Sequence, residues 1–382
     1  MMKSGYFNQN RLGGYTITDP DLKYSCQYNL LNDDILVRLD QDGLSYIQAA
    51  PPGGIVLLRR EYGEKFSKWL TFFRCGGKTY SNFARPGTER PEKTEISFLP
   101  EKAVYRYIYK GIAMETELFV PAKGGDVVCS ICFTNTAYKE LSVEAFVQMF
   151  PLIAPVNLSG WDKPEWYVRT SVHHDKEKNL IFYGRLMNPQ GFAAQRRNVS
   201  MLFGGEGVDC AEFLMDDYTG AGDFYNPDAF QREKWNYDFS VSLPFGEMGA
   251  KNSVAGFPSV YAAKYAFTLK KGESKVLTQI LSVLPQCAGG IPSESEVVSK
   301  KQYFSTEYRK KAADLACRKW ENLLAMNRVD TEDRIFDYYI NGFLPLQMQW
   351  VSILDRGWPT GMRGTRDASN DFMGLLLWNS AF

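Results

Sequence analysis

The chain has 382 residues, of which 45% are hydrophobic, so it is long enough to bury a sizeable core and favours two or three domains. Lysine plus arginine and aspartate plus glutamate both number 44, so there is no basic excess to bind a nucleic-acid backbone. No apolar run is long enough to cross a bilayer, and the first residues lack the apolar segment of a secretory signal. The lack of a signal segment and the scatter of the seven cysteines predict a cytoplasmic protein without a disulfide framework.

The first part of the chain, residues 1–290, is predicted to consist of β-strands separated by turns. Residues 127–133 are apolar between turn signals, and residues 141–149 alternate with the period of two that is typical of a strand. A turn at residues 271–274 predicts a hairpin between the strands on either side of it. Many short strands with glycine and proline turns indicate a large β-sandwich domain.

The pattern changes after Pro292, where residues 291–329 predict a helical linker. Glycine and proline are rare there, and apolar residues fall on one helical face (Ala312, Leu315, Ala316, Trp320, Leu323 and Leu324), with basic residues such as Arg309 off it. Asp330 is predicted to cap a second helix that contains Ile335, Phe336, Tyr339 and Ile340. Residues 330–382 are therefore predicted to begin a helical domain.

The segment Asp355–Asp371 is the richest in residues that could form a binding site. It contains three arginines, three aspartates, three glycines and a tryptophan, and an apolar run follows it. Charged side chains next to a buried segment must form ion pairs within the protein or bind a ligand. Arginine and aspartate form strong, directional hydrogen bonds, and pairs of them can bind sugar hydroxyls. A structural arginine–aspartate network at the mouth of the helical domain is an equally good interpretation of the residues alone.

The run Arg363–Asp371 resembles the Gly-x-Arg-Asp-x-x-Gln-Asp signature of glycoside hydrolase family 94, the cellobiose, chitobiose and cellodextrin phosphorylases, with Asn370 in place of the usual glutamine. Gly5-Tyr6-Phe7 and the segment 15–20 resemble the start of the same family. The resemblance implies a mainly β chain: a large antiparallel β-supersandwich, then linker helices and the first helices of an incomplete (α/α)6 barrel.

The resemblance also implies which residues bind substrate. By position, Arg366 and Asp367 hold the non-reducing glycosyl unit of an oligosaccharide, and Arg356 and Arg363 are further candidates for the same substrate site.

The implied reaction is inverting phosphorolysis of β-linked glucosides to a sugar 1-phosphate. Phosphate is already a nucleophile, so one carboxylic acid that protonates the leaving oxygen suffices. About 50 residues after Asp330 are too few for twelve helices, so we expect the general acid beyond Phe382 and no catalytic residue in this chain. The chain is expected to be inactive alone, and to need no cofactor besides inorganic phosphate. A homodimer, or a second chain that carries the rest of the barrel, is the expected partner.

Two other functions remain open: a non-catalytic carbohydrate-binding or scaffold subunit, and part of an inverting glycosidase with glucoamylase-like architecture. A metal site is not predicted. His173 and His174 are expected in a polar turn, and the Cys129–Cys132 pair is expected in the core because it lies in an apolar strand pattern. No site is expected at residues 222–227.

Overall fold

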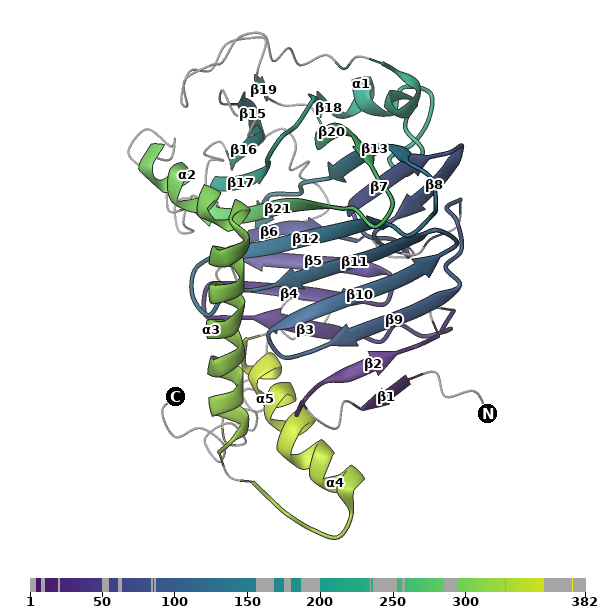
Figure 1. Cartoon of the computed structure of the whole chain (residues 1–382). Helices are drawn as coiled ribbons and strands as arrows, with labels where there is room; N and C mark the ends of the chain where they lie inside the picture. Colours follow the sequence, from purple (N-terminus) through teal and green to yellow (C-terminus); the bar gives the residue numbers. More distant parts are fainter. Residues whose placement is uncertain are drawn as a thin grey trace.

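The computed structural model shows a β domain whose strands extend to Leu284, followed by helices from Glu294 (Figure 1). This confirms the mainly β, antiparallel fold class. The structure describes residues 5–7, 11–19, 21–49, 55–60, 64–83, 85, 87–155, 168–174, 180–186, 200–233, 235, 253–255, 258–284, 294–326, 328–353 and 373. No helix in this described part is long and apolar enough to cross a membrane. The predicted domain limits at 290 and 329 stay predictions.

The largest layer is an 11-stranded sheet in which every neighbouring pair that the structure describes is antiparallel. In spatial order its strands are β1 (Gly5–Phe7), β2 (Tyr15–Ile17), β9 (Lys93–Phe98), β10 (Lys102–Tyr109), β11 (Ile112–Phe119), β12 (Asp126–Asn135), β21 (Ser274–Leu284), β17 (Ser200–Gly205), β16 (Leu180–Leu186), β15 (Val168–His174) and β19 (Ser253–Ala255).

Two five-stranded sheets lie against this layer. One has the order β18 (Cys210–Leu214), β20 (Ser259–Leu269), β13 (Leu141–Met149), β7 (Trp69–Cys75) and β8 (Lys78–Ser81). The other has the order β14 (Ala154–Pro155), β6 (Ile55–Arg59), β5 (Gly43–Ala49), β4 (Ile35–Asp40) and β3 (Tyr28–Leu31). Aromatic contacts join the layers: Phe73 stacks on Phe133 with ring centroids 4.6 Å apart, and Trp69 meets Phe203 at 5.2 Å. The core is therefore built between sheets, as in a sandwich.

The predicted hairpin around residues 271–274 is wrong. Strand β20 pairs with β13 in a five-stranded sheet, whereas β21 pairs with β12 in the 11-stranded sheet. The turn between them therefore carries the chain from one layer to the other. Alternation of apolar residues identifies a strand and its buried face, but it does not identify the partner strand.

The linker begins with α2 (Glu294–Lys301) and the 3₁₀ turn η4 (Gln302–Phe304), and continues as the long helix α3 (Thr306–Leu324), which crosses the strand ends of the 11-stranded sheet (Figure 1). The predicted helical face is partly wrong. Leu315 is 51% exposed, while Arg309, which we expected off the face, is buried. Arg309 is buried because its guanidinium donates to the carbonyl oxygens of Tyr303 and Phe304, at 2.8 and 2.7 Å, and so caps η4.

The next helix, α4 (Arg334–Tyr338), continues through a π-helical turn (Tyr339–Phe343) into α5 (Leu344–Ile353). Its N-cap is Asp333, and the prediction of Asp330 is wrong. Asp333 Oδ1 accepts hydrogen bonds from the backbone N–H groups of Ile335 and Phe336, at 2.9 and 3.1 Å, which a residue three positions earlier cannot reach.

Candidate functional site

The sugar-binding residues implied by the sequence, Arg356, Arg363, Arg366 and Asp367, lie outside the described residues. What the structure does show is how the helix that precedes them is held. Helix α5 ends at Ile353, so its anchoring fixes the point from which the chain leads to the predicted site.

Helix α5 is anchored on the β domain by an aromatic cluster. Trp350 meets Tyr28 of β3 edge-on at 4.9 Å, and Tyr28 stacks on Phe98 of β9 at 5.5 Å. The hydroxyl of Tyr28 donates to the carbonyl oxygen of Gly13 at 2.7 Å. Gly13 has φ = 72° and would clash with Leu346 of α5 if it carried a Cβ, so a glycine is required at this contact.

A cleft of about 770 Å³ lies between the end of α3, the loop around Arg11, and α4 with the π-helical turn that follows it. It is lined by Arg11, Leu12, Pro100, Trp320, Glu321, Asn322, Leu324, Ala325, Arg328, Val329, Asp330, Asp337 and Asn341. Several of its polar groups already hold the walls together. Asp337 accepts from the hydroxyl of Thr331 at 2.7 Å, and the amide of Asn341 bonds both backbone groups of Val329 at 2.8 and 2.6 Å. The geometry indicates a structural joint between α3 and the helices that follow it, rather than a reaction centre.

The same joint is tied to the β domain through Arg11. Its guanidinium forms an ion pair with the buried Glu101 at 2.6 Å, and its carbonyl oxygen accepts from the hydroxyl of Tyr338, also at 2.6 Å. One short loop therefore holds both the strand layer and α4, and the two parts are fixed relative to each other.

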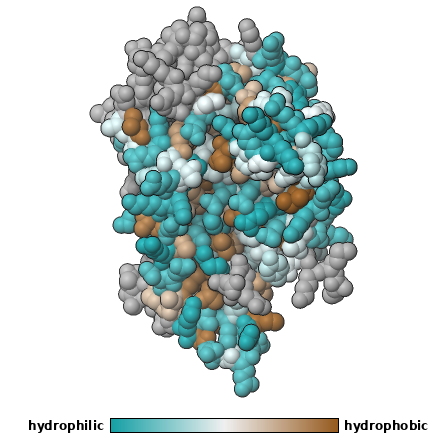
Figure 2. Space-filling view, viewed as in Figure 1, coloured by the Kyte–Doolittle hydropathy of each residue, from teal (hydrophilic) through white to brown (hydrophobic). Residues whose placement is uncertain are grey.

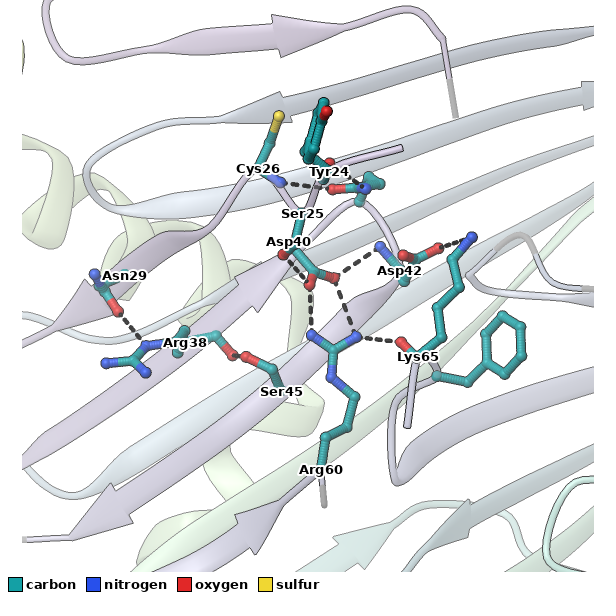
Figure 3. A network of polar contacts seen from close by, with 12 residues as sticks. Tyr24, Ser25, Cys26, Asn29, Arg38, Asp40, Asp42, Ser45, Arg60 and Lys65 are labelled. Atoms are coloured by element: carbon teal, nitrogen blue, oxygen red, sulfur yellow. Dashed lines mark hydrogen bonds and ion pairs between the residues drawn. The ribbon is translucent and has the colours of Figure 1, made fainter. Parts of the chain in front are cut away.

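A second polar cluster lies at the turn between β4 and β5 (Figure 3). Burial raises the pKa of Asp42 to about 6, and the negative charge of Asp40 adds to this, while Lys65, whose Nζ lies 3.7 Å from Oδ1 of Asp42, opposes it. A carboxyl of raised pKa beside a second carboxyl is a pattern that acid–base catalysts use.

The hydrogen bonds of this cluster indicate a structural role instead. Asp40 accepts from Ser25 Oγ at 2.6 Å, from the backbone N–H of Asp42 at 2.9 Å and from the guanidinium of Arg60. Arg60 also donates to the carbonyl oxygen of Lys65. The cluster thus joins the entry to β3, the β4–β5 turn and the end of β6, with its acceptors already engaged (Figure 3).

Asp42 gives a prediction for the pH dependence of stability. Its pKa is about 6 in the fold and 3.8 ordinarily, so the folded state holds the proton more tightly and the free energy of unfolding falls as pH rises from about 4 to 6. Asp42→Asn should remove this fall. The free energy of unfolding of the variant minus that of the wild type should therefore be about 2 kcal/mol larger at pH 7 than at pH 4. Urea unfolding at both pH values measures it, with the exposed Asp21→Asn as the control. An unchanged difference between the two pH values contradicts the assignment.

Among the described residues, no group of three histidine, cysteine, aspartate or glutamate side chains is placed to hold a metal ion. Cys129 is fully buried in β12, as predicted, and Cys132 is half-buried. His173 and His174 end the paired strand β15, so the predicted polar turn is wrong. The expectation that the protein uses no cofactor stays a prediction.

The model of the glycosyl hydrolase 94 supersandwich domain family matches residues 74–302. The chain belongs to this family. The matched part runs from the end of β7 to the start of η4, so the glycosyl hydrolase 94 supersandwich domain spans most of the layered β structure and helix α2. The resemblance seen in the sequence is thereby confirmed.

Three solved structures that align with this glycosyl hydrolase 94 chain are larger than it is. A protein described as a kojibiose phosphorylase from the human microbiome has 9% identity and a TM-score of 0.46, over 91% of this chain and 42% of that one. A bacterial glucoamylase complexed with acarbose also has 9% identity and a TM-score of 0.46, over 87% and 42%. A family GH92 α-mannosidase from Bacteroides thetaiotaomicron has 13% identity and a TM-score of 0.39, over 90% and 38%. The chain thus spans less than half of each, and these likenesses carry no conclusion. No curated protein sequence matches the chain.

Proposed function

We propose that this chain supplies the N-terminal portion of an inverting glycoside phosphorylase that cleaves β-linked glucosides with phosphate and releases a sugar 1-phosphate. The observation that carries the proposal is the family match over residues 74–302, which covers most of the β domain and the first linker helix. The anchored helix α5, which precedes the arginine–aspartate segment in the chain, is consistent with it.

In this proposal, Arg366 and Asp367 bind the non-reducing sugar ring, with Arg356 and Arg363 beside them. Their planar guanidinium groups and the carboxylate would hold the hydroxyls through charge-assisted hydrogen bonds. Phosphate attacks the anomeric carbon, and a carboxylic acid protonates the departing oxygen. We place that acid outside this chain.

The surface of α4 supports a continuation of the helical part. Ile335, Phe336 and Tyr339 are 71%, 48% and 47% exposed on the described structure. Figure 2 shows a mostly hydrophilic face with hydrophobic residues in small groups, some of them at the end of the molecule where α4 lies. Apolar groups on one helical face favour packing against further helices, here those of the proposed barrel.

The proposal is tested by phosphorolysis assays. The 382-residue chain alone is expected to show no sustained release of sugar 1-phosphate from β-linked gluco-oligosaccharides, because the proposed acid is missing. The complete protein is expected to need phosphate for turnover and to give the α-anomer from a β-linked substrate. Asp367→Ala in that protein should lower kcat/KM at least tenfold, which is about 1.4 kcal/mol of transition-state binding.

Sustained turnover by the chain alone would contradict the assignment of the acid. Hydrolysis that is independent of phosphate would favour the glycosidase alternative, and binding of oligosaccharide without any turnover of the complete protein would favour the carbohydrate-binding or scaffold subunit. The proposal also includes the partner, which is a second copy in a homodimer or a chain that carries the rest of the barrel.

A further inference from the structure

A second cleft lies on the outer face of the five-stranded sheet that contains β7 and β13. In β7, Trp69 and Phe73 point into the sandwich, so Phe72 and Arg74 point to the other face. That face is partly covered by α1 (Met215–Thr219) and the 3₁₀ turn η3 (Asp228–Gln231), from which Phe230 meets Phe146 of β13 at 4.4 Å. The residues of this cleft are therefore far in the sequence from those of the predicted sugar site.

The cleft has a volume of about 450 Å³, which is within the range of small-molecule sites. It is lined by Phe72, Arg74, Thr79, Arg85, Gly87, Thr88, Phe146, Tyr225, Asn226, Phe230 and Gln231. Four of these are aromatic, four carry hydroxyl or amide groups in addition to Tyr225, two are arginines, and none is a carboxylate. The composition combines apolar ring faces with positive charge.

Arg74 is held in place at one wall. Its Nε and Nη2 donate to Glu144 at 3.0 and 2.7 Å, and its guanidinium lies 5.2 Å from the centre of the Phe146 ring. Glu144 also binds Lys264 at 2.8 Å. One carboxylate thus serves two cations, and an excess of positive charge remains beneath the cleft.

Arg85 also lines the cleft. Its guanidinium lies 5.0 Å from the ring centres of both Phe72 and Tyr225, and 5.7 Å from that of Phe66. Burial lowers the pKa of Arg85, while Tyr225 and the nearby Asp223 raise it. Asp223 is exposed, and its Oδ1 accepts the backbone N–H groups of Tyr225 and Asn226, at 2.7 and 2.8 Å.

Around the cleft, Arg74, Arg85 and Lys264 therefore face Glu144 and Asp223. The ion pair of Lys68 with Glu64, which lies beside Tyr225, adds one charge of each sign and leaves the excess of positive charge unaltered. The balance favours an anionic ligand, because guanidinium groups form charge-assisted hydrogen bonds with phosphate or carboxylate.

We propose that this cleft binds an anionic saccharide, a sugar that carries a phosphate or a carboxylate group. The arginines would hold the anionic group, and the threonine, asparagine and glutamine side chains can donate to or accept from hydroxyls. Aromatic side chains at the cleft offer apolar surface to the C–H face of a sugar ring. The saccharide part of this inference rests on the proposed function, whereas the preference for an anion rests on the charges of the cleft.

The test is calorimetric titration of the 382-residue chain with glucose 1-phosphate, glucuronate, glucose and inorganic phosphate. Glucose 1-phosphate or glucuronate is expected to bind at least tenfold more tightly than glucose, and the tighter of the two identifies the anionic group. Arg85→Met, which keeps a long side chain against the rings, should weaken this binding at least tenfold. Arg85→Lys, which keeps the charge but loses the planar fork, should weaken it less.

Two controls locate the binding. Arg106→Met removes a charge from the far face of the 11-stranded sheet, where Arg106 pairs with Glu95 and Glu115, and should leave binding unchanged. Asp367→Ala is the background in which the titrations are repeated, because it weakens the proposed substrate site and leaves the cleft intact. Thermal unfolding of each variant checks that it is folded. Equal affinity of Arg85→Met and wild type, or equal affinity for glucose and its anionic derivatives, overturns the inference. Neither result depends on turnover, so failure here is distinct from failure of the proposed phosphorolysis.

Discussion

Replacing Trp69 with alanine is expected to lower the free energy of unfolding by about 5 kcal/mol. Trp69 is fully buried between layers, edge-on to Phe203 of the opposite sheet, and its indole N–H donates to Gln279 of β21. Gln279 in turn donates to Thr71 at 2.8 Å. The substitution would therefore open a cavity and leave a buried amide oxygen without its donor. Denaturant unfolding followed by tryptophan fluorescence and circular dichroism measures the loss.

Two variants separate the contributions at this position. Trp69→Phe keeps an aromatic ring but removes the N–H donor, so it should cost less than the alanine variant and still more than a surface change. Tyr138→Ala removes an aromatic side chain that is 91% exposed and should have little effect. If Trp69→Ala and Tyr138→Ala were equally stable, the tryptophan would not be the contact between layers that the structure shows.

Asp126→Ala is expected to detach the start of the linker from the β domain at a cost of about 3 kcal/mol. Asp126 is buried at the first residue of β12, and its carboxylate accepts from Lys300 at 2.7 and 2.9 Å and from the hydroxyl of Tyr303 at 3.2 Å. Removing it leaves a cation and a buried hydroxyl without their acceptor. Backbone amides of residues 294–304 should then exchange with deuterium at least tenfold faster, whereas those of β10 and β11 should not.

A matched surface pair serves as the control for this effect. Asp21 forms an ion pair with Arg90, but the two side chains are 67% and 80% exposed. Asp21→Ala should leave both the stability and the exchange of residues 294–304 unchanged, because exposed pairs contribute little. Unaltered exchange in Asp126→Ala would show that α2 is held by other contacts.

Much of the fold follows from local patterns, while the pairing of strands does not. Residues 141–149 form β13 as their alternation predicts, yet Phe146 and Gln148, on the face expected to be polar, are also buried. Gln148 is buried because its side chain bonds Phe224 and Tyr218, which lie 76 and 70 positions further along the chain. A period of two describes one strand, and it cannot report what later covers its second face.

The helical linker shows the same limit at the level of single residues. Helical periodicity places Trp320 and Leu324 correctly in the interface, and both are buried in α3. It fails for Arg309, since arginine is expected at the surface and is buried here only because two free carbonyl groups of the preceding turn need a donor. The sequence does not reveal this need for a donor, because it does not reveal the turn η4.

The two kinds of candidate site differ in how far sequence could reach them. The arginine–aspartate segment is continuous, so a motif identifies it, although the structure describes none of its four implied binding residues. The cleft with Arg74 and Arg85 joins residues 72–88, 146 and 225–231. No spacing along the chain links these positions, and the sequence predicts no site at residues 222–227. The only local signal, a tyrosine and asparagine in a turn, is common in any loop.

The connection from β20 to β21 has a consequence for synthesis on the ribosome. Strand β20 inserts between β18 and β13, and β21 inserts between β12 and β17, so the last two strands of the described β domain complete both of their sheets together. Four strand edges have no neighbour on that side until residue 269 has emerged, and two of them until residue 284, and such edges can pair with other nascent chains. Folding of this domain must then wait for nearly three quarters of the chain. Slow release, or a chaperone that covers open edges, would raise the yield of native protein.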